Sequence, residues 1–194
     1  MIKVAIISTG MTGGAGTAAF RLHQQLLKVT GIESTFIQRF HQDESFAEAN
    51  NIYTAPTGSS LLIRARKKCN LHTEHFNWKR FEKYPKNYEI ATYPTTSYRL
   101  EELPIVKQAD IIHLHWVAEF LNYPTFFRKV KQPIVWTLHD MNPFQGLFHY
   151  ERDQKENNAI FEKIDKKAYN LKIKAIHKKN NINIVTPPNW LNDI

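Results

Sequence analysis

The stretch that decides the fold reads Met1-Ile-Lys-Val-Ala-Ile-Ile-Ser8, followed by Thr9-Gly-Met-Thr-Gly-Gly-Ala-Gly16. Residues 2–8 are nearly all apolar, which is typical of a strand buried on both faces of a parallel sheet. The next eight residues hold four glycines and predict a tight loop. A helix of roughly 14 residues should follow and end at Gly31. We therefore expect a buried strand, a glycine-rich loop and a helix in succession.

The alternation of strand and helix recurs along the chain. Residues 40–104 are the exception: they are polar, hold four prolines, and predict long connections with one or two short helices. Strands alternating with helices indicate right-handed βαβ units. The expected fold class is therefore α/β, a doubly wound and mainly parallel Rossmann-like sheet with helices on both faces, in one domain over residues 1–194. Further strands are predicted at 34–38, 110–116, 133–139 and 183–186, and further helices at 118–131 and 159–179.

Composition places the chain among ordinary globular proteins. Apolar residues make up 42% and charged residues 23%, which excludes a wholly disordered or collagen-like chain. No apolar run approaches the roughly 20 residues that a membrane-spanning helix needs. The single cysteine, Cys69, and an N-terminus without a signal-peptide pattern predict a cytoplasmic protein.

The net charge of +8 is concentrated in two segments. Residues 61–90 carry eight basic and three acidic groups, and residues 151–180 carry nine basic and five acidic groups. Such segments favour phosphates, anionic sugars or an acidic membrane surface, or are simply solvated. Nucleic acid is not expected, because no nucleic-acid-binding motif is present. Residues 61–68, Leu61-Leu-Ile-Arg-Ala-Arg-Lys-Lys68, predict peripheral contact with an anionic membrane, unless their apolar side chains enter the core.

Ligands of doubly wound sheets bind at the carboxyl ends of the strands. The glycine loop stands at such an end and before a helix, so it suits a diphosphate; the alternative is a tight turn without a ligand. Residues 14–19 also fit a loose G-x-G-x-x-A dinucleotide pattern. That pattern requires an acidic residue after the second strand, where the chain has Gln38-Arg39. This departure disfavours a nicotinamide-dependent oxidoreductase.

Histidines follow the later strands. His113 and His115 share one face of a strand, and His139-Asp140 ends another. These groups could form a metal site, but supporting ligands at suitable spacing are missing, so we predict no metal. His113 is better interpreted as a core histidine with a hydrogen-bond partner. His139 beside Asp140 suits a hydrogen bond to a bound sugar or phosphate.

The motifs together resemble the N-terminal half of family 4 retaining glycosyltransferases of the GT-B fold, in the bacterial branch that builds capsule, exopolysaccharide and lipopolysaccharide. The similarity covers residues 1–31 and 105–194; one departure is that no cysteine cluster follows His149-Tyr150. The segments that carry it are Thr12-Gly-Gly-Ala-Gly16, Ala109-Asp-Ile-Ile-His-Leu-His-Trp116, Pro133-Ile-Val-Trp-Thr-Leu-His-Asp-Met-Asn-Pro-Phe144, His149-Tyr150, Ile184-Val-Thr-Pro187 and Trp190-Leu191.

The resemblance implies a sugar transfer with retention, from a nucleotide sugar to a saccharide or lipid-linked acceptor, without a metal or other cofactor. It implies His139 as the catalytic residue against the transferred sugar. It implies Gly13, Gly14, His115 and Asp140 as substrate-binding residues. The 194 residues would then be the acceptor-side domain, inactive without the donor-binding domain. A non-catalytic nucleotide- or phosphate-binding domain is the alternative function.

Overall fold

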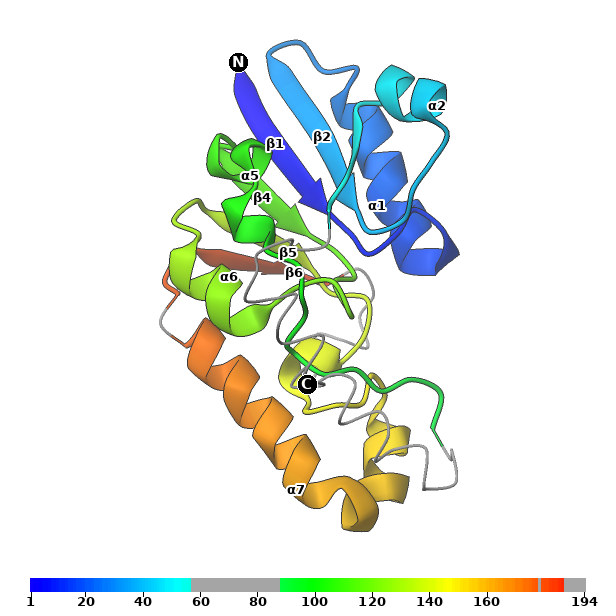
Figure 1. The fold of residues 1–194 in the computed structure, drawn as a ribbon, viewed down its shortest axis with the longest axis vertical. Coiled ribbons are helices and arrows are strands. Elements are labelled where there is room, and N and C mark those ends of the chain that lie inside the picture. Colours follow the sequence, from blue (N-terminus) through cyan, green and yellow to red (C-terminus); the bar gives the residue numbers. More distant parts are fainter. Residues whose placement is uncertain (57–87, 178, 187–194) are drawn as a thin grey trace.

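The computed structural model describes residues 1–56, 88–177 and 179–186 (Figure 1). These residues form six strands, several helices and two short 3-10 helices. In chain order the elements are β1 (Ile2–Ile7), α1 (Gly13–Leu26), β2 (Ile32–Gln38), α2 (Glu44–Ala49), β3 (Ile52–Thr54), η1 (Leu100–Glu102), α5 (Pro104–Lys107), β4 (Ile111–Leu114), α6 (Tyr123–Lys129), β5 (Ile134–Thr137), η2 (Asn142–Phe144), α7 (Glu151–Ile176) and β6 (Ile182–Val185).

The strands form one parallel sheet in the order β3-β2-β1-β4-β5-β6. The chain moves outward from β1 to β3, returns to the centre, and moves outward again from β4 to β6. The strand order therefore reverses between β1 and β4, which are neighbours in the sheet. This arrangement confirms the predicted doubly wound, Rossmann-like α/β fold.

Successive side chains of the central strand β1 enter different cores. Val4 and Ile6 of β1 pack with Phe36 and Ala19 beneath α1. Ala5 and Ile7 face the opposite side, where a larger core lies beneath α5 and α6. Figure 1 shows α1 beside β1 and β2, while α7 packs along α6. Helices thus cover both faces, as expected from strands that are apolar on both sides.

Several predicted boundaries are wrong. The first helix begins at Gly13 instead of after Gly16, and it ends at Leu26; Gly31 instead stands in the turn before β2, with a φ of +85°. The helix predicted at 118–131 occupies only Tyr123–Lys129, because Pro124 favours the first turn of a helix over its interior.

The segment predicted as long connections with one or two short helices contains such short helices, α2 and η1, and also a strand. Residues 40–104 include α2 and the edge strand β3, which was not predicted because three residues carry no periodic pattern. The last helix begins at Glu151, eight residues before its predicted start, because its first two turns are largely polar. Residues 61–68, the predicted membrane segment, lie outside the described residues. No helix among the described residues has the length and apolar character needed to cross a bilayer.

Gly16 provides a test of how α1 packs against the glycine loop. A Cβ at this position would lie 2.6 Å from the carbonyl oxygen of Gly10 and 2.8 Å from the carbonyl carbon of Met11. We expect Gly16→Ala to lower the free energy of unfolding by about 1–3 kcal/mol, because backbone cannot move aside as a side chain does. Urea denaturation measures the change.

The matched control is Gly14→Ala, in the same turn of α1. A Cβ on Gly14 would meet no heavy atom within 4 Å, so this variant should keep the stability of the original chain or gain up to about 1 kcal/mol. Equal stability of the two variants would show that close packing at Gly16 does not constrain the loop.

Candidate functional site

An open cleft lies at the carboxyl edge of the sheet, where β1, β4 and β5 end together. Ile7, Leu114 and Trp136 are aligned across these strands, so the loops that follow begin side by side. The cleft lies where the strand order reverses, which is the usual ligand position in this kind of sheet. Its volume is about 490 Å³. It is lined by Ser8, Thr9, Gly10, Thr12, Gly13, Gly14, Ala15, Gly16, Phe40, Trp116, His139, Asp140 and Tyr150.

Glycines after β1 form one wall of the cleft. Gly13 has a φ of +73°, a left-handed conformation that glycine adopts without steric cost. A Cβ on Gly13 or Gly14 would meet no heavy atom within 4 Å, so the space beside both is open. Both residues lie in the first turn of α1, where backbone N–H groups lack helical acceptors and the helix dipole is positive. This wall is therefore suited to an anionic group.

Hydrogen bonds join the loop after β1 to the loop after β4. The Thr9 N–H donates to the carbonyl of Trp116 at 2.8 Å, and the Thr9 hydroxyl donates to the carbonyl of Ala118 at 2.7 Å. Beyond them, the Arg39 guanidinium pairs with the Glu119 carboxylate at 2.8 Å. The two loops that flank the sheet's reversal point therefore hold each other in place.

Asp140 is a buried carboxylate with three hydrogen-bond donors around it. Its Oδ2 accepts from Trp116 Nε1 at 2.7 Å and from His149 Nδ1 at 2.5 Å, and its Oδ1 accepts from the Asn142 N–H at 2.9 Å. On the far side of the ring, His149 Nε2 bonds the Thr92 hydroxyl at 2.8 Å. Burial opposes ionisation of Asp140, but the donors outweigh it and hold the pKa below its ordinary value.

Three histidines stack in a row behind and beside the cleft. His115 lies between His113 and His139, with ring centroids 4.5 Å and 5.3 Å apart. Burial first, and then the neighbouring histidines, lower the pKa of His113 to about 4 and that of His115 to about 3. Burial also lowers the pKa of His139, although Asp140 opposes this. The row is therefore uncharged at neutral pH.

The hydrogen bonds of the row favour one tautomer of His139. His115 Nδ1 lies 3.0 Å from His139 Nε2, while His115 Nε2 is buried and has no partner among the described residues. An unpartnered buried N–H is rarer than an unpartnered acceptor, so His115 carries its hydrogen on Nδ1 and donates it to His139 Nε2. His139 then carries its own hydrogen on Nδ1. It can donate that hydrogen to an oxygen of a ligand in the cleft.

A fully buried lysine, Lys172 of α7, supports the loop that follows β5. Its ammonium donates to the carbonyl and the side-chain oxygen of Asn142 at 2.6 and 2.9 Å. The carbonyls of Gly146 at 2.7 Å and Gln145 at 3.2 Å are also within hydrogen-bond distance, so its three hydrogens are shared among four acceptors. The Tyr123 ring lies 5.6 Å away. One side chain thus fixes the turn that presents the N–H of Asn142 to Asp140.

Burial disfavours the charged form of Lys172. It lowers the pKa of this lysine to about 7, although the charges of Asp140 and Asp165 oppose the shift. The same turn is fixed from α7 a second time, because the Asp165 carboxylate accepts from the Leu147 N–H at 2.7 Å. The turn therefore depends on two side chains of one helix.

The cleft brings together four of the five predicted site residues: Gly13, Gly14, His139 and Asp140. The fifth predicted residue is His115. It lies behind His139, only 4% exposed, and does not line the cleft. His113 is bonded to the Thr137 hydroxyl at 2.8 Å, as expected for a core histidine. No three His, Cys, Asp or Glu side chains in the described ranges converge in a way that could hold a metal ion.

The sequence did not identify Lys172, Asn142 or Phe40 as parts of the site. A signal for Lys172 was present: it stands four residues after the buried Ala168, on the apolar stripe of α7. A lysine in that position must either reach solvent or find buried acceptors. No comparable pattern marks Phe40, which reaches the cleft from the end of β2.

Comparisons with protein-family models, curated proteins and solved structures find no match to this chain. The fold and the geometry of the cleft are therefore the observations on which a functional proposal must rest.

The pKa of Lys172 predicts how stability depends on pH. This lysine has a pKa of about 7 in the folded protein and about 10.4 when unfolded. Burying its charge therefore costs free energy below pH 7, and this cost disappears as the pH rises between the two values. We expect the stability of the original chain relative to Lys172→Met to increase by about 3 kcal/mol from about pH 6 to about pH 9.

Urea denaturation of both proteins at a series of pH values measures this difference. The matched control is Lys167→Met, which removes a lysine from an exposed position of the same helix. A pH-independent difference for Lys172→Met would mean that Lys172 keeps an ordinary affinity for its proton in the folded chain.

Proposed function

We propose that this chain is the acceptor-side domain of a retaining glycosyltransferase that takes its sugar from a nucleotide-sugar donor. The observation that carries the proposal is the meeting of Gly13 and Gly14 with His139 and Asp140 in one open cleft. The acceptor would be a saccharide or a lipid-linked saccharide. The resemblance of the sequence motifs to family 4 glycosyltransferases supports the same function.

Each wall of the cleft suits a different part of such a substrate. The N–H groups in the first turn of α1 suit the diphosphate, since they are unpaired donors at the positive end of the helix. The Nδ1–H of His139 suits a sugar hydroxyl or a phosphate oxygen. Phe40 and Tyr150 are 53% and 37% exposed at the cleft, and aromatic side chains of this kind pack against sugar rings or bases.

The buried carboxylate of Asp140 positions its surroundings. Trp116 and His149 donate to it from two sides, so its negative charge stays fixed beside His139. Such an arrangement would favour positive charge developing on the transferred sugar. In the retaining reaction, the acceptor oxygen would attack from the face that the diphosphate leaves, and the diphosphate would accept the proton.

A nicotinamide-dependent oxidoreductase is less compatible with the end of β2. An acidic residue holds the ribose there in dinucleotide-binding folds. Here Gln38 is buried, and Arg39 pairs with Glu119. Neither residue supplies a carboxylate that could accept from the ribose hydroxyls, and the guanidinium of Arg39 is already paired.

Binding of nucleotide sugars to Gly14→Val tests the proposal. We expect UDP- or GDP-sugars to bind the 194-residue chain weakly, in the millimolar range, because solvent competes for every hydrogen bond in an open cleft. The bound sugar should shift the amide NMR signals of Gly13 and Gly14 and the imidazole signals of His139. Gly14→Val should fold normally but lose these shifts, because its branches occupy the space of the diphosphate.

The matched control is Ala18→Val, which adds the same branches at an exposed position of α1 outside the cleft. It should keep the shifts. Binding by Gly14→Val as strong as by the control would contradict the role of the glycine wall. Shifts with NAD or NADP but not with nucleotide sugars would favour an oxidoreductase. Shifts with nucleotides regardless of the sugar would favour a non-catalytic nucleotide-binding domain.

A further inference from the structure

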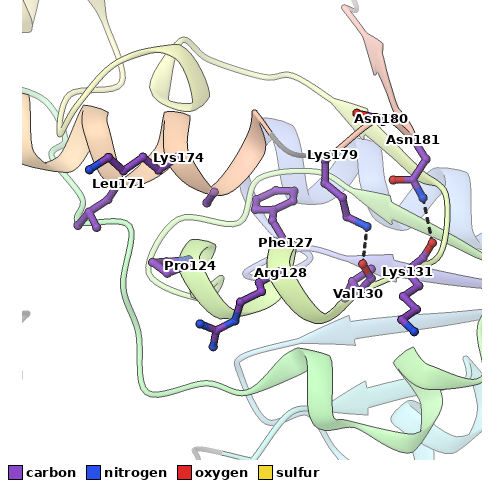
Figure 2. Close-up of a pocket in the computed structure, with 11 residues that line it drawn as sticks. Pro124, Phe127, Arg128, Val130, Lys131, Leu171, Lys174, Lys179, Asn180 and Asn181 are labelled. Carbon is purple, nitrogen blue, oxygen red and sulfur yellow. Dashed lines mark hydrogen bonds between the residues drawn. The ribbon is translucent and has the colours of Figure 1, made fainter.

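A second hollow of about 580 Å³ lies between α6 and α7, at the opposite edge of the sheet from the cleft. Figure 2 shows its lining residues and the hydrogen bonds made by Lys179 and Asn181. The Asn181 side chain donates to the carbonyls of Lys131 and Gln132 at 2.9 Å each, and the Lys179 ammonium donates to the carbonyl of Val130. These bonds fix the chain just before β5 and β6, so the hollow is a preformed part of the fold.

The hollow combines an apolar floor with a positive rim. Pro124 and Phe127 of α6 line it together with Leu171 and Ala175 of α7. The cations of its rim are Arg128, Lys131 and Lys174, none of which forms an ion pair within the described part of the chain. No acidic residue of the described ranges lines it. The surface is therefore complementary to a ligand with both apolar and anionic groups.

The positive surface continues along α7. Another hollow, of about 440 Å³, shares Leu171 and Lys174 with the hollow between α6 and α7. It is also lined by Lys163, Lys166 and Lys167. From Lys163 to Lys174 the helix rises about 16 Å. The two hollows thus form one elongated surface, which we call the basic track. Its cations are Lys163, Lys166, Lys167 and Lys174 of α7 together with Arg128 and Lys131.

The shape of the basic track favours a chain-like ligand. A bilayer surface is too flat to fill two hollows in line. A single phosphate would need converging cations, whereas the side chains of Arg128, Lys131 and Lys174 extend in different directions (Figure 2). A peptide segment can place apolar side chains on the floor and carboxylates opposite the lysines at the same time.

We propose that the basic track binds an acidic segment of a partner protein, with apolar side chains of that segment seated between Phe127 and Leu171. The carboxylates of the segment pair with the lysines of α7 and with Arg128. No residue of the track lines the cleft, so the partner leaves the cleft open to its own ligands. The proposal is independent of what the cleft binds.

Fluorescence anisotropy with a labelled peptide of repeated Glu-Glu-Leu triplets tests the proposal. The peptide should bind, and binding should weaken as salt screens the exposed charges. The double variant Arg128→Glu with Lys174→Glu should weaken binding about tenfold, since each exposed ion pair contributes modestly. The control Lys28→Glu, exposed beyond the end of α1, should bind like the original chain.

Two further peptides separate charge from shape. Replacing every glutamate by glutamine should abolish binding, and replacing every leucine by serine should weaken it. Equal binding of the leucine and serine peptides would overturn the seating between the helices, leaving only charge attraction. Binding of vesicles with anionic phospholipid, but not of the peptide, would identify the track as a membrane surface and overturn the proposal.

Discussion

The carboxylate of Asp140 is the group on which the geometry of the carboxyl edge depends. It accepts hydrogen bonds from Trp116 after β4, from the backbone of Asn142 after β5, and from His149 at the end of the same loop. Asn142 and His149 are buried, and a buried donor left unpaired costs about 1–3 kcal/mol. One negative charge therefore determines how two neighbouring loops meet, and with them the wall of the cleft that holds His139.

A buried charge of this kind needs compensation, and the protonated form of Lys172 on α7 supplies part of it. The ammonium of Lys172 lies among backbone carbonyls of the loop after β5, as a bound cation would. The histidine row, in contrast, is kept neutral by burial. The cleft is consequently surrounded by fixed dipoles and a small number of fixed charges. Such a surrounding needs little reorganisation when a charged ligand arrives.

The sequence predicted the sheet and most of the site for identifiable reasons. Residues 2–16 combine an apolar strand with a glycine loop, and both periodicity and glycine chemistry act locally. The strand β3 could not be predicted from the sequence, because its pairing with β2 stabilises it and its own three residues carry no pattern. The depth of His115 and the buried acceptors of Lys172 could not be predicted, because periodicity shows which face a residue occupies, but not how deep it lies or which carbonyls lie near it.

The strand order also bears on how the chain folds. β1 pairs with β2, where Ile7 meets Ile37 after roughly 30 residues, and with β4, where Ile7 meets Leu114 after roughly 107. Closing the longer loop costs about 1 kcal/mol more in chain entropy. The segments β1–β3 and β4–β6 each pair among themselves, so each can form before the two halves dock. The cleft lies where the two halves dock, at the pairing of β1 with β4. We therefore expect the cleft to form late in folding. Its backbone amide hydrogens should exchange with solvent when β1 and β4 separate.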